Sequence, residues 1–475
     1  MILLLLGFTP YLHAQRLEAS RPTDLTEVIT SALTHYPAIL AAMSDIDARE
    51  GELLASNGAF DPRLEGSLND RLSGYYDGGA LDGGFVQELP FMNTTVFGGY
   101  RRSNGDFPQY DFDRLTRNDG EFRFGFSLSL LRDRDIDDDR AARQNAGLSV
   151  LLQNREFSAE QLSLVQDVYV AWVRWLVTWR LRDAYNELLE ISLARGDAIR
   201  QSIAAGDTAE ILQVENNQAV LQRRALVAEA DRQINMNAER LALFLRDTDG
   251  NMLYPLYSPE LTIPEEDRDM LSRPVESLLQ NIFERRPEIA QARLKQEQSE
   301  VKLALAENLM KPKVDFKLYS SRDFGGGPLA LAGSEAVADI SFSYPLRTRE
   351  ARGKASAAMA EITGQRHRIR LLMDSLEVEI RQSRVNLDAT RQLEQLAVEE
   401  LEMATQLADA EQERFSAGLS DFFLLNIRER QIAEAQLKRW QAHLQHQVAL
   451  ASYYGATMNL DGLGASGTEV SIEIP

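Results

Sequence analysis

The sequence predicts a mainly α-helical, duplicated fold in which each half also contributes a short group of β-strands. Three observations predict it. Short motifs recur in the same order in the two halves, very long segments show helical periodicity, and short segments between them alternate apolar and polar residues. The composition, with 44% hydrophobic and 26% charged residues, is typical of a folded chain.

The two halves share three short motifs. The matching ranges are 33–39 with 283–289, 59–62 with 309–312, and 203–208 with 415–420. The first two pairs keep one offset between the halves, whereas the third pair has a shorter one. The difference arises because residues 63–131 are about twice as long as residues 313–346. We therefore interpret the chain as two structural repeats, the second of which is shorter in its middle part.

Each repeat is expected to contain a first helix, strands and a long helical hairpin. The expected ranges are 15–246 for the first repeat, with its helix at 25–57, strands at about 63–131 and hairpin at 141–246, and 273–458 for the second, with its helix at 275–308, strands at about 313–346 and hairpin at 351–458. The first helices end before Pro62 and Pro312, because proline cannot continue a helix. Residues 247–272 contain three prolines and are predicted to be a linker, and residues 459–475 a flexible tail.

The long helices are the most unusual prediction. A helix of about 65 residues is about 100 Å long at about 1.5 Å per residue, whereas globular helices average about 11 residues. Their apolar stripe is narrow and rich in alanine, as in Leu393, Leu396, Ala404 and Leu407. Such a stripe favours close pairing of helices. We expect a cylinder wall in which each long helix lies beside two shorter ones.

The strand segments alternate with period two, as in residues 122–130, 313–318 and 340–344. In a membrane their apolar members would form the outward face, namely Phe122, Phe124, Phe126, Leu128, Val314, Phe316, Leu318, Ile340, Phe342 and Tyr344. A half-buried sheet in water would show the same alternation. Residues 74–84 and 103–120 are polar and rich in glycine, which favours exposed loops.

The N-terminus favours export from the cytoplasm. Residues 1–14 resemble a secretory signal peptide, with an apolar run at 2–6 and a cleavage-like site at 12–14, although a short buried helix is the alternative. No stretch reaches the ~18 apolar residues of a membrane helix. Such a chain spans a membrane only as a closed barrel, which needs about eight strands or more. With about four to six strands per chain, several chains must share one barrel, and three chains of four strands would give about twelve.

The order of these elements resembles the TolC family of outer-membrane efflux proteins over about residues 25–459. The resemblance rests on Tyr36-Pro37 and Arg286-Pro287, Asp61-Pro62 and Lys311-Pro312, Tyr344-Pro345-Leu346, residues 415–421 and, more weakly, residues 203–210. It implies a homotrimer with a long α-helical periplasmic barrel continuous with a shared 12-stranded β-barrel in the outer membrane of a Gram-negative-type bacterium. It further implies a passive exit duct for efflux or type I secretion that docks onto a periplasmic adaptor (membrane fusion protein) and an inner-membrane pump.

The resemblance places the helix reversals at the periplasmic tip, where the adaptor would dock. The expected tip residues are Gly206, Asp207, Thr208, Gly418, Leu419, Ser420 and Asp421. The family's entrance often carries acidic residues about two turns after the tip glycine, where this chain has Leu424 and Ile427. The nearest acids, Glu210, Glu215 and Asp421, are the candidate entrance residues. The chain has no cysteine and therefore is expected to carry no acyl anchor.

Other chemistries are disfavoured. A net charge of −21 argues against nucleic acid, and the absence of cysteine excludes disulfides and thiolate metal sites. We interpret His443 and His446 as solvated surface residues rather than metal ligands, and Tyr169, Trp172, Trp175 and Trp179 as helix packing rather than a ligand platform. No metal, cofactor or enzymatic activity is expected. The alternative function is a soluble periplasmic coiled-coil scaffold or adaptor, although an adaptor should carry one hairpin rather than two matching halves.

Overall fold

A computed structural model describes residues 17–19, 21–267 and 271–465. The expected signal peptide (1–14) and the last part of the expected tail (466–475) lie outside the described residues. The chain forms two compact units, and each takes segments from both repeats. Unit 1 comprises residues 1–43, 157–287 and 372–475, and unit 2 comprises residues 44–156 and 288–371. No helix in the described ranges has the length and apolarity needed to cross a bilayer.

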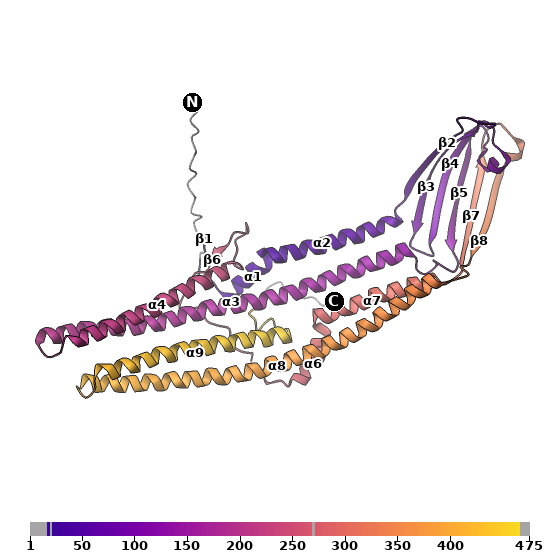
Figure 1. Ribbon diagram of the computed structural model, residues 1–475. Coiled ribbons are helices and arrows are strands. Elements are labelled where there is room, and N and C mark those ends of the chain that lie inside the picture. Colours follow the sequence, from indigo (N-terminus) through magenta and orange to yellow (C-terminus); the bar gives the residue numbers. More distant parts are fainter. Residues whose placement is uncertain (1–16, 20, 268–270, 466–475) are drawn as a thin grey trace, which may run out of the picture. The chain divides into compact units, whose positions relative to one another are not determined.

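Unit 1 is built around two helical hairpins, α3–α4 and α8–α9 (Figure 1). The helices are α3 Asp138–Ala205, α4 Ile211–Ala242, α8 Arg349–Ser416 and α9 Phe422–Thr457. The first parts of α3 and α8 belong to unit 2. Two short strands, β1 Leu17–Glu18 and β6 Leu253–Tyr254, pair in parallel. The two predicted long hairpins are therefore present, with long helices of 68 residues each.

The first helix of each repeat is broken, and the prediction of one continuous helix is wrong. The observed helices are α1 Leu25–His35 and α2 Pro37–Asn57 in the first repeat, and α6 Val275–Arg285 and α7 Pro287–Asn308 in the second. Tyr36 and Arg286, which precede the prolines, are extended, with ψ of 127° and 120°. The proline ring disfavours the helical conformation of the residue before it, whereas proline itself suits the first position of a helix.

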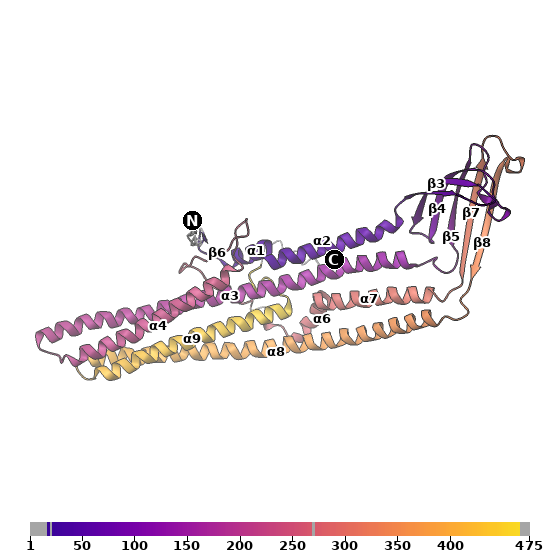
Figure 2. The same ribbon diagram turned by 45° about the horizontal axis from the view of Figure 1, so that its top comes forward.

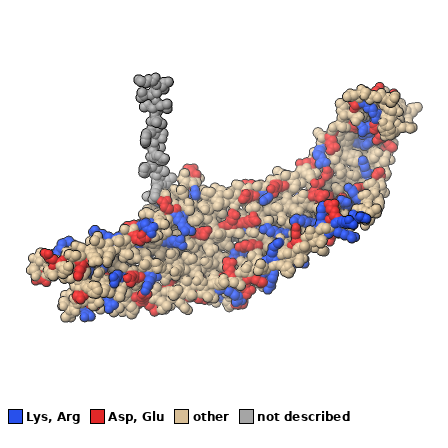
Figure 3. Space-filling view, in the orientation of Figure 1, with Lys and Arg blue, Asp and Glu red and all other residues tan. Residues whose placement is uncertain are grey.

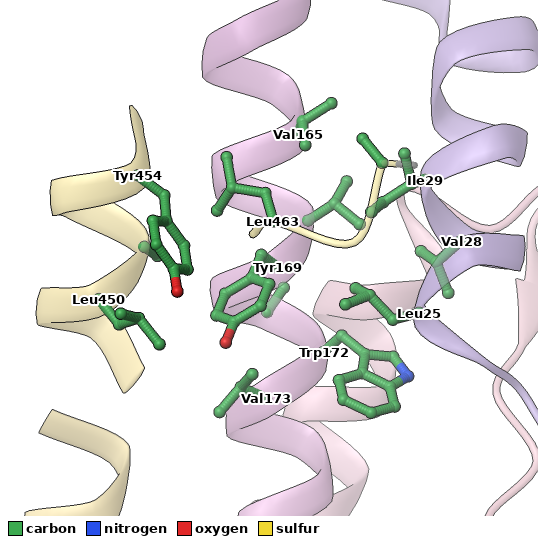
Figure 4. Packing of buried hydrophobic residues seen from close by; sticks show 14 of the residues in the cluster. Leu25, Val28, Ile29, Val165, Tyr169, Trp172, Val173, Leu450, Tyr454 and Leu463 are labelled. Carbon is green, nitrogen blue, oxygen red and sulfur yellow. The ribbon is translucent and has the colours of Figure 1, made fainter. Parts of the chain in front are cut away.

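The core of unit 1 contains the aromatic stripe of α3. Tyr169, Trp172 and Trp175 are at most 1% exposed, and they pack among α1 and α9 residues such as Leu25 and Leu450 (Figure 4). The indole N–H of Trp172 donates to the carbonyl of Thr23 at 3.1 Å, and the Tyr169 hydroxyl donates to Gln447 Oε1 at 2.7 Å. Trp179 stacks on Tyr257 with ring centroids 4.3 Å apart. The interpretation of the stripe as helix packing is confirmed.

Two segments expected to be loose are packed instead. In the expected linker 247–272, Leu261 and Leu271 are buried, and Arg180 donates to the carbonyls of Pro259 and Leu261. In the expected flexible tail, Leu463 is fully buried in the core. Apolar residues spaced among prolines and glycines gave no periodic signal, so the sequence pattern did not predict this burial.

Unit 2 contains one antiparallel sheet, which has six strands within the described residues (Figures 1 and 2). The strands are, in sheet order, β2 Arg63–Asp70, β3 Gly79–Leu89, β4 Thr94–Asn104, β5 Glu121–Ser129, β7 Lys313–Asp323 and β8 Ser334–Ser343. Short 3₁₀ segments lie at Gly58–Phe60, Gln109–Arg114, which is kinked at Asp111, and Leu329–Leu331.

The hairpin β3–β4 corrects the prediction that residues 74–84 form a loop. Glycines at positions 83, 84, 98 and 99 interrupt the apolar alternation, and this hid both strands from a pattern-based prediction. The glycines have a structural cause. A Cβ atom on Gly84 would lie 2.6 Å from the Gly98 carbonyl oxygen, and one on Gly98 would lie 2.6 Å from the Phe85 ring. The two strands therefore approach each other where side chains would not fit.

Candidate docking tip and membrane face

Both predicted tip turns lie at the same end of unit 1 and have the same backbone structure (Figures 1 and 2). Gly206 and Gly418 are left-handed, with φ of 82° and 70°. In the first turn, the N–H group of Gly206 donates to the carbonyl of Ile203, and that of Asp207 donates to the carbonyl of Ser202. In the second turn, the N–H group of Gly418 donates to the carbonyl of Phe415, and that of Leu419 donates to the carbonyl of Arg414. Each long helix thus ends in a Schellman motif, whose left-handed position glycine adopts without steric cost.

The side chains at the turns divide into structural and exposed groups. Thr208 bonds to the Ser202 hydroxyl at 2.6 Å, and Ser420 bonds to the buried carboxylate of Glu411. Asp421 is the N-cap of α9, because its Oδ1 accepts the Leu424 N–H at 2.8 Å. The apolar residues of the two tips are exposed, namely Ile211, Val214, Leu419 and Phe423, at 59–71%. These four side chains form the tip surface, to which the sequence analysis assigned only Leu419.

The candidate entrance acids lie at the starts of the two return helices. Glu210 occupies the N-cap position of α4, where its side chain makes no capping hydrogen bond, and Glu215 is one turn further along. Asp421 starts α9. The hydrogen bonds and ion pairs found among the described residues do not join these three acids to one another. Their role at an entrance stays a prediction.

A buried ionic cluster ties the two hairpins together. Glu429 of α9 is 6% exposed and pairs with Arg195 of α3 and Arg223 of α4, which are 9% and 6% exposed. Arg195 Nη1 donates to Glu429 Oε2 at 2.9 Å. Burial lowers the pKa of Arg223, and the carboxylate of Glu429 opposes this effect. The sequence gives no signal for this cluster, because Glu429 lies 234 residues from Arg195 and 206 from Arg223 and the helices are rich in charged residues throughout.

The histidines of α9 belong to a second polar cluster, and the interpretation of both as solvated is wrong. His446 is 2% exposed, and its Nε2 donates to Glu266 at 2.5 Å. His443 Nδ1 lies 2.6 Å from Glu394. Burial raises the pKa of each glutamate, but the hydrogen bond from its histidine and nearby cations, for Glu266 chiefly Arg391, outweigh burial and lower it. Within the described ranges, no group of three or more potential ligands is arranged to hold a metal.

The sheet of unit 2 has one apolar face. Directly paired residues of neighbouring strands share a face, so the strand register assigns every side chain. Phe122, Phe124, Phe126 and Leu128 of β5 share their face with Val314, Phe316 and Leu318 of β7 and with Ile340 and Phe342 of β8. Tyr344 follows directly after β8. The register therefore brings together nine of the ten residues predicted to face outward, and several are open to solvent in the single chain, such as Phe124 and Phe342 at 70%.

The opposite face of the sheet carries most of the charges, whereas Asp70, Arg102 and Arg322 lie on the apolar face, near one end of their strands. The charged members of the opposite face are Arg63, Glu65, Asp82, Glu88, Arg101, Glu121, Arg123, Lys313, Asp315, Lys317, Asp323, Glu335 and Asp339. Both signs are interspersed, and they form pairs such as Arg63 with Glu88 at 2.6 Å. Figure 3 shows acidic and basic side chains similarly intermingled over the helices. The two faces of the sheet thus differ in polarity, except near the ends of β2, β4 and β7 that carry Asp70, Arg102 and Arg322.

The fold of this chain, with long helical hairpins and a two-faced antiparallel sheet, is similar to that of several solved outer-membrane channels. Similar solved structures include the open state of the MtrE outer-membrane channel of Neisseria gonorrhoeae, with 14% identity, 91% of this chain and 88% of that chain covered, and a TM-score of 0.63. The outer-membrane protein VceC of Vibrio cholerae has 15% identity, coverages of 91% and 95% and a TM-score of 0.61. The CmeC outer-membrane channel of Campylobacter jejuni has 13% identity, coverages of 96% and 93% and a TM-score of 0.60.

The comparison by sequence finds no matching family model and no matching curated protein. The likeness to these solved structures is therefore one of fold. It confirms the fold that the resemblance to TolC-family proteins predicts, a mainly helical chain with a sheet region.

Proposed function

We propose that this protein is the outer-membrane exit duct of a tripartite efflux or type I secretion system, extending from the outer membrane into the periplasm. In this proposal the chain forms a homotrimer and acts as a passive conduit, while a periplasmic adaptor and an inner-membrane pump supply specificity and energy. The fold shared with MtrE, VceC and CmeC supports the proposal.

The observation that carries the proposal is the polarity of the sheet. An apolar face that includes exposed phenylalanines is unfavourable in water, because apolar surface costs about 25 cal/mol per Å² to hydrate. Against lipid the same face is favourable, while a charged opposite face suits a water-filled lumen. A soluble scaffold would need another layer to cover this face.

The tip supports a docking role. Ile211, Val214, Leu419 and Phe423 are exposed around the two glycine turns. Exposed apolar side chains grouped at one end of a helical unit are typical of a protein–protein contact. We assign this tip surface to the adaptor, together with the predicted residues Gly206, Asp207, Thr208, Gly418, Ser420 and Asp421. No step of this function requires catalysis by the chain.

Two neighbouring residues of β8 test the membrane assignment. Ile340 lies on the apolar face and Ser341 on the charged face, and both are exposed in the single chain. Ile340→Arg would place a cation in lipid, which costs about 2–4 kcal/mol near the bilayer centre, whereas Ser341→Arg would face water. We expect Ile340→Arg to lower the amount of heat-modifiable protein in the outer-membrane fraction and Ser341→Arg to leave it near the level of the unmodified protein.

The measurement is membrane fractionation followed by gels of boiled and unboiled samples, since closed barrels often resist unfolding without boiling. Recovery of the unmodified protein as a soluble monomer would contradict the proposed function. Equal tolerance of arginine at both positions would contradict the assignment of the apolar face to lipid.

A further inference from the structure

We infer that the barrel built by this chain has eighteen strands, with β2 of each copy paired to β8 of the next. The inference rests on the proposed function. It differs from the twelve strands that the family resemblance implies, because the sheet has six strands per chain, rather than four, within the described residues. Three such chains contribute eighteen.

The hairpin β3–β4 is an added pair in the first repeat. β2 follows α2 as β7 follows α7, and β5 precedes α3 as β8 precedes α8. The two ends of the hairpin lie side by side, since the Gly78 N–H donates to the Asp106 carbonyl at 3.0 Å. The added pair therefore starts and ends at the same end of the sheet. Its insertion leaves the direction of every other strand unchanged.

The added hairpin spans the full height of the sheet. Each of its strands has 11 residues, and about 9–11 residues suffice to cross a bilayer. All 11 positions of β3 pair with β4, and β4 pairs with β5 over seven. The turn at residues 90–93 reaches the end of β5, where the Ser129 N–H donates to the Met92 carbonyl at 3.0 Å. The hairpin is thus part of the wall and not a plug folded against it.

The hairpin also continues both faces of the sheet. Leu81 and Phe85 of β3 and Val96 and Tyr100 of β4 share the apolar face with Phe122 and its neighbours, and the one charged residue of the hairpin on this face is Arg102, near the end of β4. Asp82 and Arg101 share the charged face and form an ion pair at 2.5 Å. A hairpin that lay inside a lumen would not need an apolar face in register with that of the membrane strands. The pattern therefore places β3 and β4 between lipid and lumen.

The two edge strands fit a second copy of the same chain. Neighbouring strands are antiparallel throughout the sheet, so β2 and β8 run in opposite directions and can themselves pair antiparallel. They have 8 and 10 residues, and both are exposed along almost their entire length. Six strands are too few to close a barrel, for which about eight are needed, and an open edge in lipid is costly. Copies of the chain must then close the ring edge to edge.

An eighteen-stranded barrel has consequences for the channel. Barrel diameter grows roughly in proportion to strand number, so the ring is about 1.5 times as wide as one of twelve strands. The widening concerns the membrane part, because the hairpin adds strands and no helix.

Cysteine labelling tests the inference, since the chain has no cysteine of its own. In the full-length protein in lipid vesicles, we compare Leu81→Cys with Asp82→Cys, neighbours on opposite faces of β3. We expect a water-soluble maleimide to label Asp82→Cys about tenfold faster, because the reactive thiolate forms in water. A fluorophore at Leu81→Cys should be quenched by brominated lipid, whereas one at Asp82→Cys should not.

Strand number is read directly by electron microscopy of the oligomer in nanodiscs. A variant lacking residues 79–104, joined from Gly78 to Gly105, is expected to have a ring about two-thirds as wide. Eighteen strands in the unmodified ring, with the labelling pattern above, support the inference. A trimer with twelve strands, a dimeric ring, or equal aqueous labelling at both positions overturns it while leaving the exit duct in place. A protein that never enters membranes instead overturns the proposed function.

Discussion

The two repeats differ in their strands and agree in their helices. α3 and α8 have 68 residues each, both first helices break before a proline, and both long helices end in a glycine Schellman motif. By contrast, the first repeat contributes four strands of the sheet and the second contributes two, counted over the described residues. The two repeats thus have the same helices, and the first repeat has one more strand pair than the second.

The comparison shows which part of the fold tolerates change. A strand pair starts and ends at the same side of the sheet, so its insertion leaves the remaining strands antiparallel. A change in the length of one long helix would instead separate the two tip turns, which lie at the same end of unit 1 (Figure 1). The contacts that hold the two hairpins together at the tip should therefore have the largest effects when altered.

The largest expected effect is that of Glu429→Ala. The substitution removes the shared partner of Arg195 and Arg223 and leaves two buried cations facing each other. Removing one partner of a buried ion pair costs about 3–5 kcal/mol. We expect a marked fall in the midpoint of thermal unfolding in detergent, followed by circular dichroism of the helices.

Glu434→Ala is the control for this prediction. Glu434 lies on the same helix, and its side chain is 65% exposed. Its ion pair with Arg430 is long, at 4.0 Å, and open to solvent, so the loss of the carboxylate should change the stability little. Equal effects of the two substitutions would show that the buried cluster does not hold the hairpins of the two repeats together.

A smaller effect is expected at the two glycine turns. Gly206→Ala and Gly418→Ala meet no atom within 4 Å, so only the left-handed backbone opposes them. That conformation costs a non-glycine residue about 1–2 kcal/mol, and the cost should be equal in the two repeats. Gly147→Ala, within α3 and with open space around it, is the control and should stabilise the helix by up to about 1 kcal/mol. Unequal losses at the two turns would indicate that the tips are not equivalent.

The helical part of the fold could be predicted from the sequence because its signals are local. Glycine turns and apolar periodicity predicted both long hairpins to within a few residues. The breaks at Tyr36 and Arg286 were also encoded locally, in the prolines that follow, but the periodicity that continues across them favoured one helix. The hairpin β3–β4 was hidden because its glycines replace side chains that would have shown the alternation.

The candidate site was predictable only in part, for a physical reason. The turns at Gly206 and Gly418 have a local signature, and so do the alternating residues of β5, β7 and β8. The cluster around Glu429 depends on which of many charged residues become buried together. That choice follows from how the helices pack, and spacing along the chain does not encode it.

The caps of the return helices distinguish the two tips. Asp421 accepts a hydrogen bond from the Leu424 N–H, whereas Glu210 makes no such bond at the corresponding position of α4. Asp421→Ala should cost about 1 kcal/mol, and Glu210→Ala should be close to neutral. Thermal unfolding of the two variants measures the difference. A cost at Glu210 equal to that at Asp421 would show that the first tip has a capping role for its acid as well.

The smallest effect on stability at neutral pH is that of the histidine–glutamate cluster, which consists of His443 and His446 of α9, Glu394 of α8 and Glu266 of the segment 247–272. Its contribution to stability changes only in acid. The pKa values of Glu266 and Glu394 lie below the ordinary value of 4.5, because hydrogen bonds from His446 and His443, together with nearby cations, outweigh the effect of burial. The unfolded chain then takes up protons at a higher pH than the folded chain, so this stabilisation is complete above about pH 4.5 and decreases as the pH falls through the lowered values. We expect the unfolding midpoint to fall in that window, and Glu266→Gln to flatten the decrease. An unchanged pH profile in this variant would show that the pairing of Glu266 with His446 does not contribute to the acid sensitivity of unit 1.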